Sequence, residues 1–239
     1  MSENPTDRTD SNAPDAAEVH LYVLLDRSGS MASIADDVIG GYNRLLADQR
    51  GLGSRTRITL VQFDSNNPQE VVADAVPVSE VLPLEHETFV PRGSTPLLDA
   101  TGRLIARATA RQHQHAALGH EEEIVFVSIT DGHENASQEL TLPAVRKMID
   151  ERTEAGWTFV FLSAALDVYG EATSLGYDPR SAQSFTADAE GVHLAMDSLS
   201  RSVGEFRQDV LEGRTFDKGD FFRDDKAAEE DRRRRGSDG

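Results

Sequence analysis

The stretch 19-VHLYVLLDRSGSMAS-33 joins an apolar run to a short polar loop, and a single aspartate stands at the junction. An apolar run without alternation is typical of a strand that is buried on both faces of a parallel sheet. After Asp26, hydroxyl residues follow at i+2 and i+4, namely Ser28 and Ser30. In an extended turn this spacing can aim all three side chains toward the same side of the loop. The pattern leaves four possibilities open: a metal site, a nucleophile on a tight turn, a phosphate-binding loop, or an ordinary helix cap.

Two further apolar runs, 124-IVFVSIT-130 and 158-TFVFLSAA-165, have the same unbroken character. Other strands are expected at 57–63, at 70–77 and, as a short edge strand, at 182–186. Apolar residues at the helical period predict helices at about 34–49, 96–113, 140–155, 168–175 and 188–210. Strands that alternate with helices in this way predict a Rossmann-like α/β fold. Its sheet would be open, doubly wound and mostly parallel, with one antiparallel edge strand and helices on both faces.

The two ends of the chain differ in composition from the middle. Residues 1–17 are rich in Ser, Asp, Asn and Pro, and residues 213–239 finish in 229-EEDRRRRGSDG-239. Polar, charged composition of this kind is typical of disordered segments. We therefore expect one folded domain over 18–212, between a disordered N-terminal tail and a disordered, charged C-terminal tail.

The chain of 239 residues has a formal net charge of -18 and no cysteine. This charge argues against a nucleic-acid partner and is compatible with divalent cations or basic partner surfaces. The absence of cysteine excludes disulfides, thiolate zinc sites and cysteine nucleophiles. The N-terminus lacks the pattern of a secretory signal, and no apolar run approaches the ~20 residues that span a bilayer. A cytoplasmic protein that is monomeric on its own and does not contact membranes is expected.

Two other polar stretches begin where a strand ends or a helix is about to start. In 91-PRGSTPLLDA-100, Thr95 precedes a proline at the expected first helical position. In 128-SITDGHEN-135, Asp131 ends a buried strand and a glycine follows. Ligands of doubly wound sheets bind outside the carboxyl ends of the strands, so both loops can lie at the same edge as Asp26. Hydroxyl and carboxylate oxygens suit a hard cation, and Mg²⁺ prefers six of them, so water or further loops would complete the shell.

The motifs "LDRSGSM", "GSTPLLDA" and "ITDGHEN", in this order, resemble the three loops that form the metal-ion-dependent adhesion site (MIDAS) of von Willebrand factor type A domains. The resemblance covers about 19–210. It implies direct metal ligands at Ser28, Ser30 and Thr95, with Asp26 and Asp131 contacting the metal directly or through water. The segment 157–207 resembles stand-alone bacterial and phage members of the family, some of which are related to components of tellurium-resistance and stress-response operons.

Three neutral hydroxyls and few direct carboxylates would leave a divalent cation under-neutralised, with a free coordination position for a carboxylate of another protein. This chemistry and the resemblance together predict a metal-dependent protein-interaction module, and no enzyme. The expected cation is Mg²⁺, with Mn²⁺ or Ca²⁺ as alternatives, and the expected partner is a protein that presents Glu or Asp. Four further polar residues near the motifs are candidates to support the metal or to contact the partner: Asp64, Asp99, His133 and Glu134.

The alternative from another class of function is a Mg²⁺-dependent phosphohydrolase of the haloacid dehalogenase type, built on Asp26. Such an enzyme needs a second acid two residues later, where this chain has Ser28, and a downstream lysine, for which Lys147 alone is available before the tail. The nucleophile elbow G-x-S-x-G is absent around 27-RSGSM-31. Ordinary helix capping remains the simplest alternative for Ser28 and Thr95.

A group of histidines and acids also stands outside the motifs. His113, His115 and His120 precede or adjoin the acidic residues 121–123. Their spacing matches no standard zinc pattern, so a solvated polar face is expected there.

Overall fold

The computed structural model describes residues 17–53, 55–218 and 221–222. Its centre is a six-stranded sheet with the order β3-β2-β1-β4-β5-β6, in which β3 runs antiparallel to β2 and the other neighbours pair in parallel. The strands are β1 (Glu18–Asp26), β2 (Thr56–Asp64), β3 (Asn67–Pro77), β4 (Glu122–Thr130), β5 (Thr158–Ser163) and β6 (Ala182–Ser184). This sheet confirms the predicted fold class, including the antiparallel edge strand.

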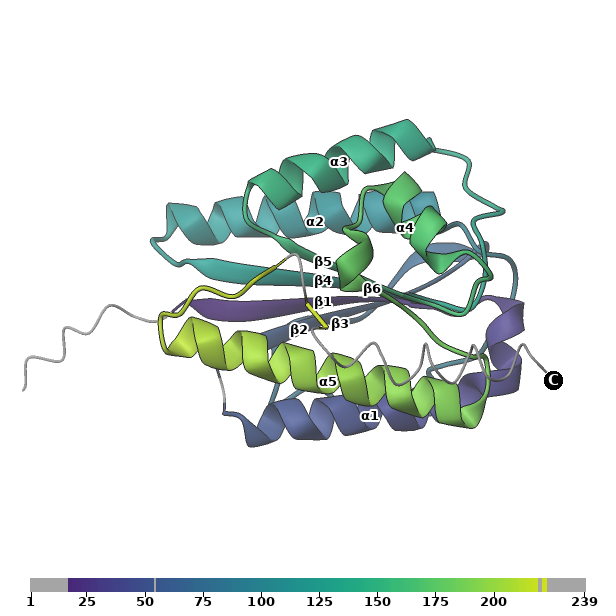
Figure 1. The fold of residues 1–239 in the computed structure, drawn as a ribbon, viewed down its shortest axis with the longest axis horizontal. Helices are drawn as coiled ribbons and strands as arrows, with labels where there is room; N and C mark the ends of the chain where they lie inside the picture. The colour runs from purple at the N-terminus through teal and green to yellow at the C-terminus, as the bar shows by residue number, and fades with distance from the viewer. Residues whose placement is uncertain (1–16, 54, 219–220, 223–239) are drawn as a thin grey trace, which may run out of the picture.

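Helices cover both faces of the sheet (Figure 1). On one face lie α1 (Ala35–Gly51) and α5 (Ala189–Leu211), and on the other lie α2 (Leu97–Ala117), α3 (Leu142–Glu154) and α4 (Val168–Leu175). Short 3₁₀ turns, η1 (Gly29–Ile34) and η2 (Pro179–Ser181), precede α1 and β6. Successive residues of β1 enter opposite apolar layers, with Val23 in the layer of α1 and α5 and Leu24 in the layer of α2 to α4. Burial on both faces explains why this strand is apolar without alternation.

The strand order places the carboxyl ends of β1 and β4 side by side. Leu25 pairs with Ile129 across β1 and β4, and Asp26 pairs with Phe63 across β1 and β2. The chain leaves β1 toward β2 on one side, while β4 lies on the other, so the order reverses at β1. The loops after β1 and β4 therefore leave the sheet together at the position where doubly wound folds bind ligands.

Helices α1 and α5 approach each other closely at one glycine. A Cβ atom at Gly41 would lie 2.6 Å from Cγ of Met196, whereas a Cβ atom at the neighbouring Gly40 would meet nothing within 4 Å. Gly41 thus allows α5 to pack directly against the backbone of α1, and Gly40 faces away from that contact.

The chain after α5 continues to pack against the domain. The aromatic side chains of Phe216, Phe221 and Phe222 are buried in the same apolar layer as α1 and α5. The rings of Phe206 and Phe216 meet edge to face with centroids 5.2 Å apart. The described part of the expected C-terminal tail is therefore anchored by aromatic burial. We propose that the folded domain extends at least to Phe222. The expected tail over 1–17 lies outside the described residues except for Ala17.

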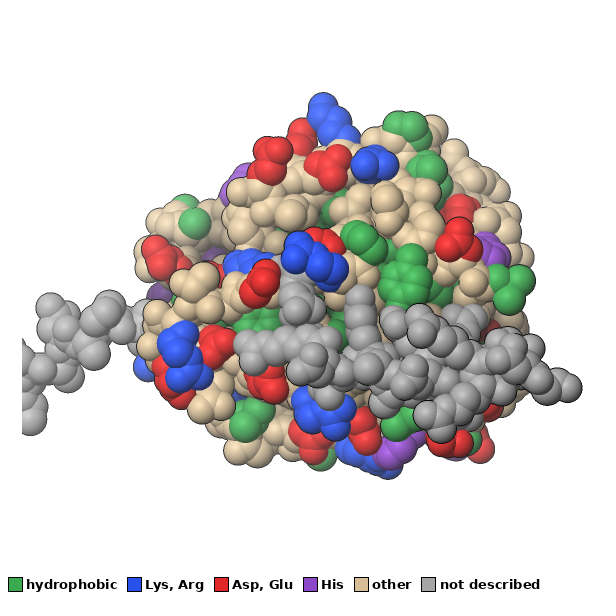
Figure 2. Space-filling model, viewed as in Figure 1, with side chains coloured by type: hydrophobic (Ala, Val, Ile, Leu, Met, Phe, Trp, Pro, Cys, Tyr) green, Lys and Arg blue, Asp and Glu red, His purple; other side chains and the backbone are tan. Residues whose placement is uncertain are grey.

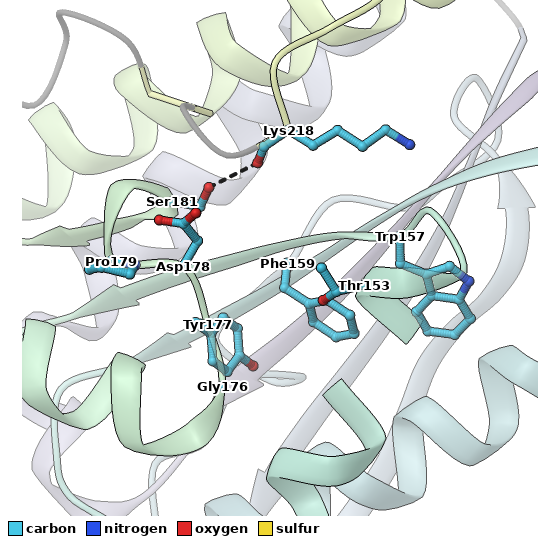
Figure 3. Close-up of a pocket in the computed structure, with 9 residues that line it drawn as sticks. All are labelled: Thr153, Trp157, Phe159, Gly176, Tyr177, Asp178, Pro179, Ser181 and Lys218. Carbon is cyan, nitrogen blue, oxygen red and sulfur yellow. Dashed lines mark hydrogen bonds between the residues drawn. The ribbon is translucent and has the colours of Figure 1, made fainter. Parts of the chain in front are cut away.

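Polar contacts hold this C-terminal segment against η2 and the start of β4. The Ser181 hydroxyl donates to the backbone oxygen of Lys218 at 3.1 Å (Figure 3). The Lys218 ammonium donates to Glu123 at 2.8 Å. A cavity of about 370 Å³ lies beside Lys218. Trp157 and Tyr177 are among the residues that line it (Figure 3).

The charge of the molecule is mixed on the face that carries α3, α4 and α5. Acidic and basic side chains are interspersed there and do not separate by sign (Figure 2). Among the described residues, no helix is both long and apolar enough to span a bilayer.

Candidate metal centre

Asp26 ends β1, and its side chain is fully buried at the sheet edge. Its Oδ1 accepts a hydrogen bond from the backbone N–H of Ser28 at 2.6 Å, which folds the loop into a tight turn. Its Oδ2 accepts from the hydroxyl of Thr130 at 2.6 Å, and this hydroxyl lies within 3.1 Å of both the N–H and the carbonyl of Gly132. The Asp26 carboxylate thus joins the loop after β1 to the loop after β4.

A chain of short contacts continues from Ser28 to Asp131. The hydroxyls of Ser28 and Ser30 lie 3.1 Å apart, and the Ser30 hydroxyl donates to Oδ1 of Asp131 at 2.7 Å. Ser28 is buried and Ser30 is exposed. The oxygens of these three side chains therefore form one connected group that reaches solvent at Ser30.

Thr95 is brought to the same place by the loop after β4. The backbone N–H of Thr95 donates to Oδ1 of Asn135 at 2.9 Å, and the N–H of Asn135 donates to the Thr95 carbonyl at 3.1 Å. A Cβ atom at Gly132 would lie 3.7 Å from the Thr95 hydroxyl oxygen and 3.8 Å from that of Ser30. Both hydroxyls therefore lie beside Gly132, within van der Waals contact of the position that a Cβ atom would take.

We call Asp26, Ser28, Ser30, Thr95 and Asp131 the oxygen cluster. Its three loops are also joined through the backbone. The N–H of Gly29 donates to the carbonyl of Gly93 at 3.1 Å, and the N–H of Arg92 donates to the carbonyl of Arg27 at 2.8 Å. The five side chains thus stand on a framework of main-chain hydrogen bonds, which limits how far they can move apart.

The structure does not support helix capping by the hydroxyls of Ser28 and Thr95. Ser28 precedes η1, but its side chain makes no cap hydrogen bond. Helix α2 begins at Leu97, one residue later than expected, with Pro96 before it. Its first free N–H groups are satisfied from the loop after β4, because Leu98 donates to Glu134 at 2.8 Å and Asp99 donates to the hydroxyl of Ser137 at 3.1 Å. These caps leave the Thr95 hydroxyl out of helix capping.

The two carboxylates of the oxygen cluster lack a positively charged partner among the described residues. Burial raises the pKa of Asp26 to about 6, and the charge of Asp131 adds to the rise, while hydrogen bonds from Thr130 and Ser28 oppose it. Burial also raises the pKa of Asp131, against the hydrogen bond from Ser30. A buried carboxylate beside a second carboxylate is costly unless a cation compensates both.

Asp64 shows the opposite behaviour at the same edge of the sheet. It ends β2 and is as buried as Asp26, and burial alone would raise its pKa. The Asn66 amide and the Arg27 guanidinium outweigh burial, so the pKa of Asp64 is lowered. Arg27 donates to Oδ2 of Asp64 at 2.9 and 2.7 Å, and Arg92 donates to the same oxygen at 3.1 Å. Asp64 is therefore neutralised by arginines of the chain itself, and Asp26 is not.

The other candidate residues near the motifs are placed by separate contacts. Asp99 accepts hydrogen bonds from the amides of Gln138, Glu139 and Leu140, at 2.8 to 3.3 Å. Glu134 accepts from Leu98, Ala136 and Ser137. Both carboxylates therefore organise the loop after β4 and the start of α2. His133 is exposed and its Nδ1 lies 3.3 Å from Oε2 of Glu171 in α4, so of these candidates it is the one that faces solvent.

Sequence reasoning missed three residues that build this centre. Thr130 lies within a strand and carried no loop signal, although it holds Oδ2 of Asp26. Asn135 lies in the third motif, where its residue type predicted no role, and it forms hydrogen bonds with both the N–H and the carbonyl of Thr95. Arg27 stands inside the first motif but points into the buried network with Asp64, Gln62 and Glu70.

Three solved structures show what this arrangement is similar to. The pilus adhesin SpaC from Lactobacillus rhamnosus GG, in its open conformation, matches with a TM-score of 0.59 and 12% identity, over 80% of this chain and 30% of the adhesin. Proximal thread matrix protein 1 from the mussel byssus, with a zinc-occupied MIDAS motif, matches with a TM-score of 0.51 and 12% identity, over 79% and 46% of the two chains. A von Willebrand factor type A protein from Catenulispora acidiphila matches with a TM-score of 0.51 and 14% identity, over 78% and 42%.

This chain thus spans less than half of each of these three chains. No protein-family model and no curated protein sequence matches it. At such low identities the likeness concerns the fold, and the fold is that of von Willebrand factor type A domains.

Proposed function

We propose that the oxygen cluster binds one divalent cation and that this cation binds a carboxylate side chain of a partner protein. The observation that carries the proposal is the Asp26 carboxylate. It is fully buried beside Asp131 and accepts hydrogen bonds from the neutral groups of Ser28 and Thr130, while its neighbour Asp64 has two arginines. A bound divalent cation supplies positive charge at this position and a coordination site for an external carboxylate.

The donor set supports a hard cation. The cluster offers three hydroxyl and two carboxylate groups and no nitrogen or sulfur, which fits Mg²⁺ first and Mn²⁺ or Ca²⁺ as alternatives. Water would complete the shell, because Ser30 lies at the exposed side of the cluster. The zinc in the mussel protein's MIDAS motif supports a divalent cation on this fold and leaves its identity in this chain to measurement.

We assign binding, and no reaction, to the oxygen cluster. A phosphohydrolase built on Asp26 would need an acid at Ser28 and a lysine near the site. Ser28 contributes a hydroxyl, and Lys147 is exposed on α3, where it pairs with Glu151 at 3.7 Å. The resemblance of segment 157–207 supports a bacterial stress-response or phage setting, and a cytoplasmic monomer remains part of this proposal.

Isothermal titration with Mg²⁺ tests the metal. Asp26→Ala should abolish Mg²⁺ binding while the far-ultraviolet circular dichroism stays that of the wild type. Asp36→Ala is the matched control, because Asp36 is a highly exposed acid in the first turn of α1. Unchanged Mg²⁺ affinity in Asp26→Ala would sink the metal assignment.

Affinity capture tests the partner. The full chain is immobilised and exposed to bacterial lysate with Mg²⁺ or with a chelator, and retained proteins are identified by mass spectrometry. A partner that binds through the cation should be retained with Mg²⁺ by the wild type and lost with the chelator or with Asp26→Ala. Retention of the same proteins under all three conditions would show that the contact does not involve the metal.

A further inference from the structure

Three side chains with metal-binding atoms meet at the amino ends of β1 and β4. Glu18 and Glu122 are register partners at the start of these two strands, and His115 comes from the last turn of α2. One ligand atom from each of the three lies within 4.8 Å of the others. We call these residues the amino-edge cluster. It lies at the opposite end of β1 from Asp26, and the nine residues of that strand separate the two clusters by roughly 26 Å.

The Glu122 carboxylate is the unusual member of the amino-edge cluster. Its side chain has no exposed surface, and its Oε1 lies 3.0 Å from Nδ1 of His115 and 3.4 Å from the guanidinium of Arg111. Among the described residues, its Oε2 has no hydrogen-bond partner. Nδ1 of His115 also has no hydrogen-bond partner among the described residues. Its 3.0 Å contact with Oε1 of Glu122 does not have the geometry of a hydrogen bond. Buried polar atoms without partners are rare in folded proteins and call for a ligand that completes them.

The neighbouring polar groups form hydrogen bonds with other atoms and not with Oε2 of Glu122 or Nδ1 of His115. Nε2 of His20 lies 2.9 Å from the Thr59 hydroxyl, and its Nδ1 accepts from Arg111 at 3.4 Å. Arg111 also donates to Oε1 of Glu122 at 3.4 Å, and Arg57 donates to Oε2 of Glu18 at 3.0 Å. Each arginine thus holds one oxygen of a carboxylate and leaves the other oxygen available, as groups outside a metal's ligand shell commonly do.

We infer that the amino-edge cluster is a second cation site, which binds a transition-metal ion of the Zn²⁺ type through His115, Glu122 and Glu18. One imidazole nitrogen and two carboxylates form a donor set that suits Zn²⁺, with water in the fourth position. The imidazole makes this set a poorer match for Mg²⁺, so the two clusters should differ in metal preference. The carboxyl end of α2 also favours a cation at His115, because helix C-termini carry partial negative charge.

Such an ion would tie together three elements that meet at this edge. β1 and β4 are adjacent strands, and α2 leads into β4 through residues 118–121. Coordination by one residue from each element would stabilise the folded state, and this stabilisation would grow with the logarithm of the metal concentration above the dissociation constant.

A zinc titration of the full chain tests the inference. Asp26→Ala serves as the background, so that the oxygen cluster does not compete, and Mg²⁺ is kept in excess. Calorimetry should show one equivalent of Zn²⁺ bound in this background. Adding His115→Ala should weaken binding by about 100-fold or more, since even a group outside the ligand shell contributes 10- to 100-fold. Adding Glu122→Gln should do the same. Adding His113→Ala, a histidine on the same helix but outside the cluster, should change nothing.

The visible absorption of bound Co²⁺ gives an independent readout of histidine ligation and should be lost with His115→Ala but not with His113→Ala. His115 is partly exposed, so its substitution can be followed without relying on the fully buried Glu122. Failure of the Asp26→Ala background to bind Zn²⁺, or equal affinity with and without His115, would overturn the inference. Neither result would bear on Mg²⁺ binding at the oxygen cluster, which is measured in the wild type.

Discussion

The hydroxyl of Ser30 donates a 2.7 Å hydrogen bond to the carboxylate of Asp131, although the two residues are 101 positions apart in the sequence. This bond by itself connects the loop after β1 to the loop after β4. Donor groups that are already in contact need little rearrangement to bind an ion, and such preorganisation favours affinity.

Ser30→Ala should weaken Mg²⁺ binding by about 10- to 100-fold, because the variant removes both a proposed ligand and the contact that positions Asp131. The free energy of unfolding should change by no more than about 1 kcal/mol, since the side chain is exposed. Titration calorimetry and urea unfolding measure the two quantities. Ser33→Ala is the control, because that hydroxyl is in the same turn but bonds to the Ser30 carbonyl. Equal losses of affinity in both variants would contradict a ligand role for Ser30.

Without metal, stability should fall as the pH rises. The pKa of Asp26 is raised from 3.8 to about 6 in the folded state, so the folded protein holds a proton that the unfolded chain has released. The stabilisation from this proton is complete below about pH 4 and is lost as the pH rises through about 6, by up to roughly 3 kcal/mol. Urea unfolding in chelator at pH 5 and pH 7.5 should show about half of this loss in the wild type, roughly 1.4 kcal/mol, because the rest occurs below pH 5, and a smaller loss in Asp26→Asn. Equal losses in the two proteins would exclude Asp26 as the source.

Arg27→Ala should destabilise the protein by about 3 kcal/mol, because it removes the main partner of the buried Asp64 carboxylate and also a partner of Glu70. Arg92 and two amides still contact Asp64, which limits the loss. Denaturant unfolding measures the change, with Arg44→Ala as the control for a half-exposed arginine. A loss no larger than that of Arg44→Ala would show that the Asp64 network contributes little to stability.

The adjacent glycines of α1 should respond in opposite directions. Gly40→Ala should stabilise the protein by about 1 kcal/mol, since alanine favours a helix and the new methyl group meets nothing. Gly41→Ala should destabilise it by about 1 to 3 kcal/mol, because its methyl group would press on Met196 of α5. Thermal unfolding of the two variants is the measurement, and changes of the same sign would contradict the close approach of α1 and α5.

Phe221→Ala should cost about 3 to 5 kcal/mol if the chain beyond α5 belongs to the folded domain, as expected for a large aromatic side chain removed from a core. Leu211→Ala is the matched control, because that leucine is 43% exposed at the end of α5 and should change stability by no more than about 0.5 kcal/mol. Chemical denaturation compares the two. An effect of Phe221→Ala as small as that of the control would return the domain boundary to about residue 212.

The sequence predicted the parts of this protein that depend on local pattern. Unbroken apolar runs identified β1, β4 and β5, because strands buried on both faces have no polar face to alternate. The rule that ligands bind at the carboxyl ends of such strands then placed Asp26 and Asp131 at one edge, and the strand order agrees.

The rest depends on contacts between distant segments that a local pattern does not encode. The charged composition after residue 212 gave no indication that Phe221 is buried. Its burial depends on packing against the apolar layer of α1 and α5. The role of Asn135 depends on how the loop after β4 folds back onto Thr95. Histidine spacing alone gave no hint that His115 would meet Glu122, because the pairing arises from the length of α2 and the start of β4.

Helix α2 runs without a break from the oxygen cluster to the amino-edge cluster. It begins two residues after Thr95, and His115 lies two residues before its end, so its 21 residues extend roughly 30 Å between the two ends of the sheet. If a cation at either end shifts this helix along its axis, the cation affinities of the two clusters become coupled. Each cation must then change the affinity for the other by the same factor. A Zn²⁺ titration repeated with and without Mg²⁺ in the wild type would then measure the coupling free energy between the two ends of the sheet.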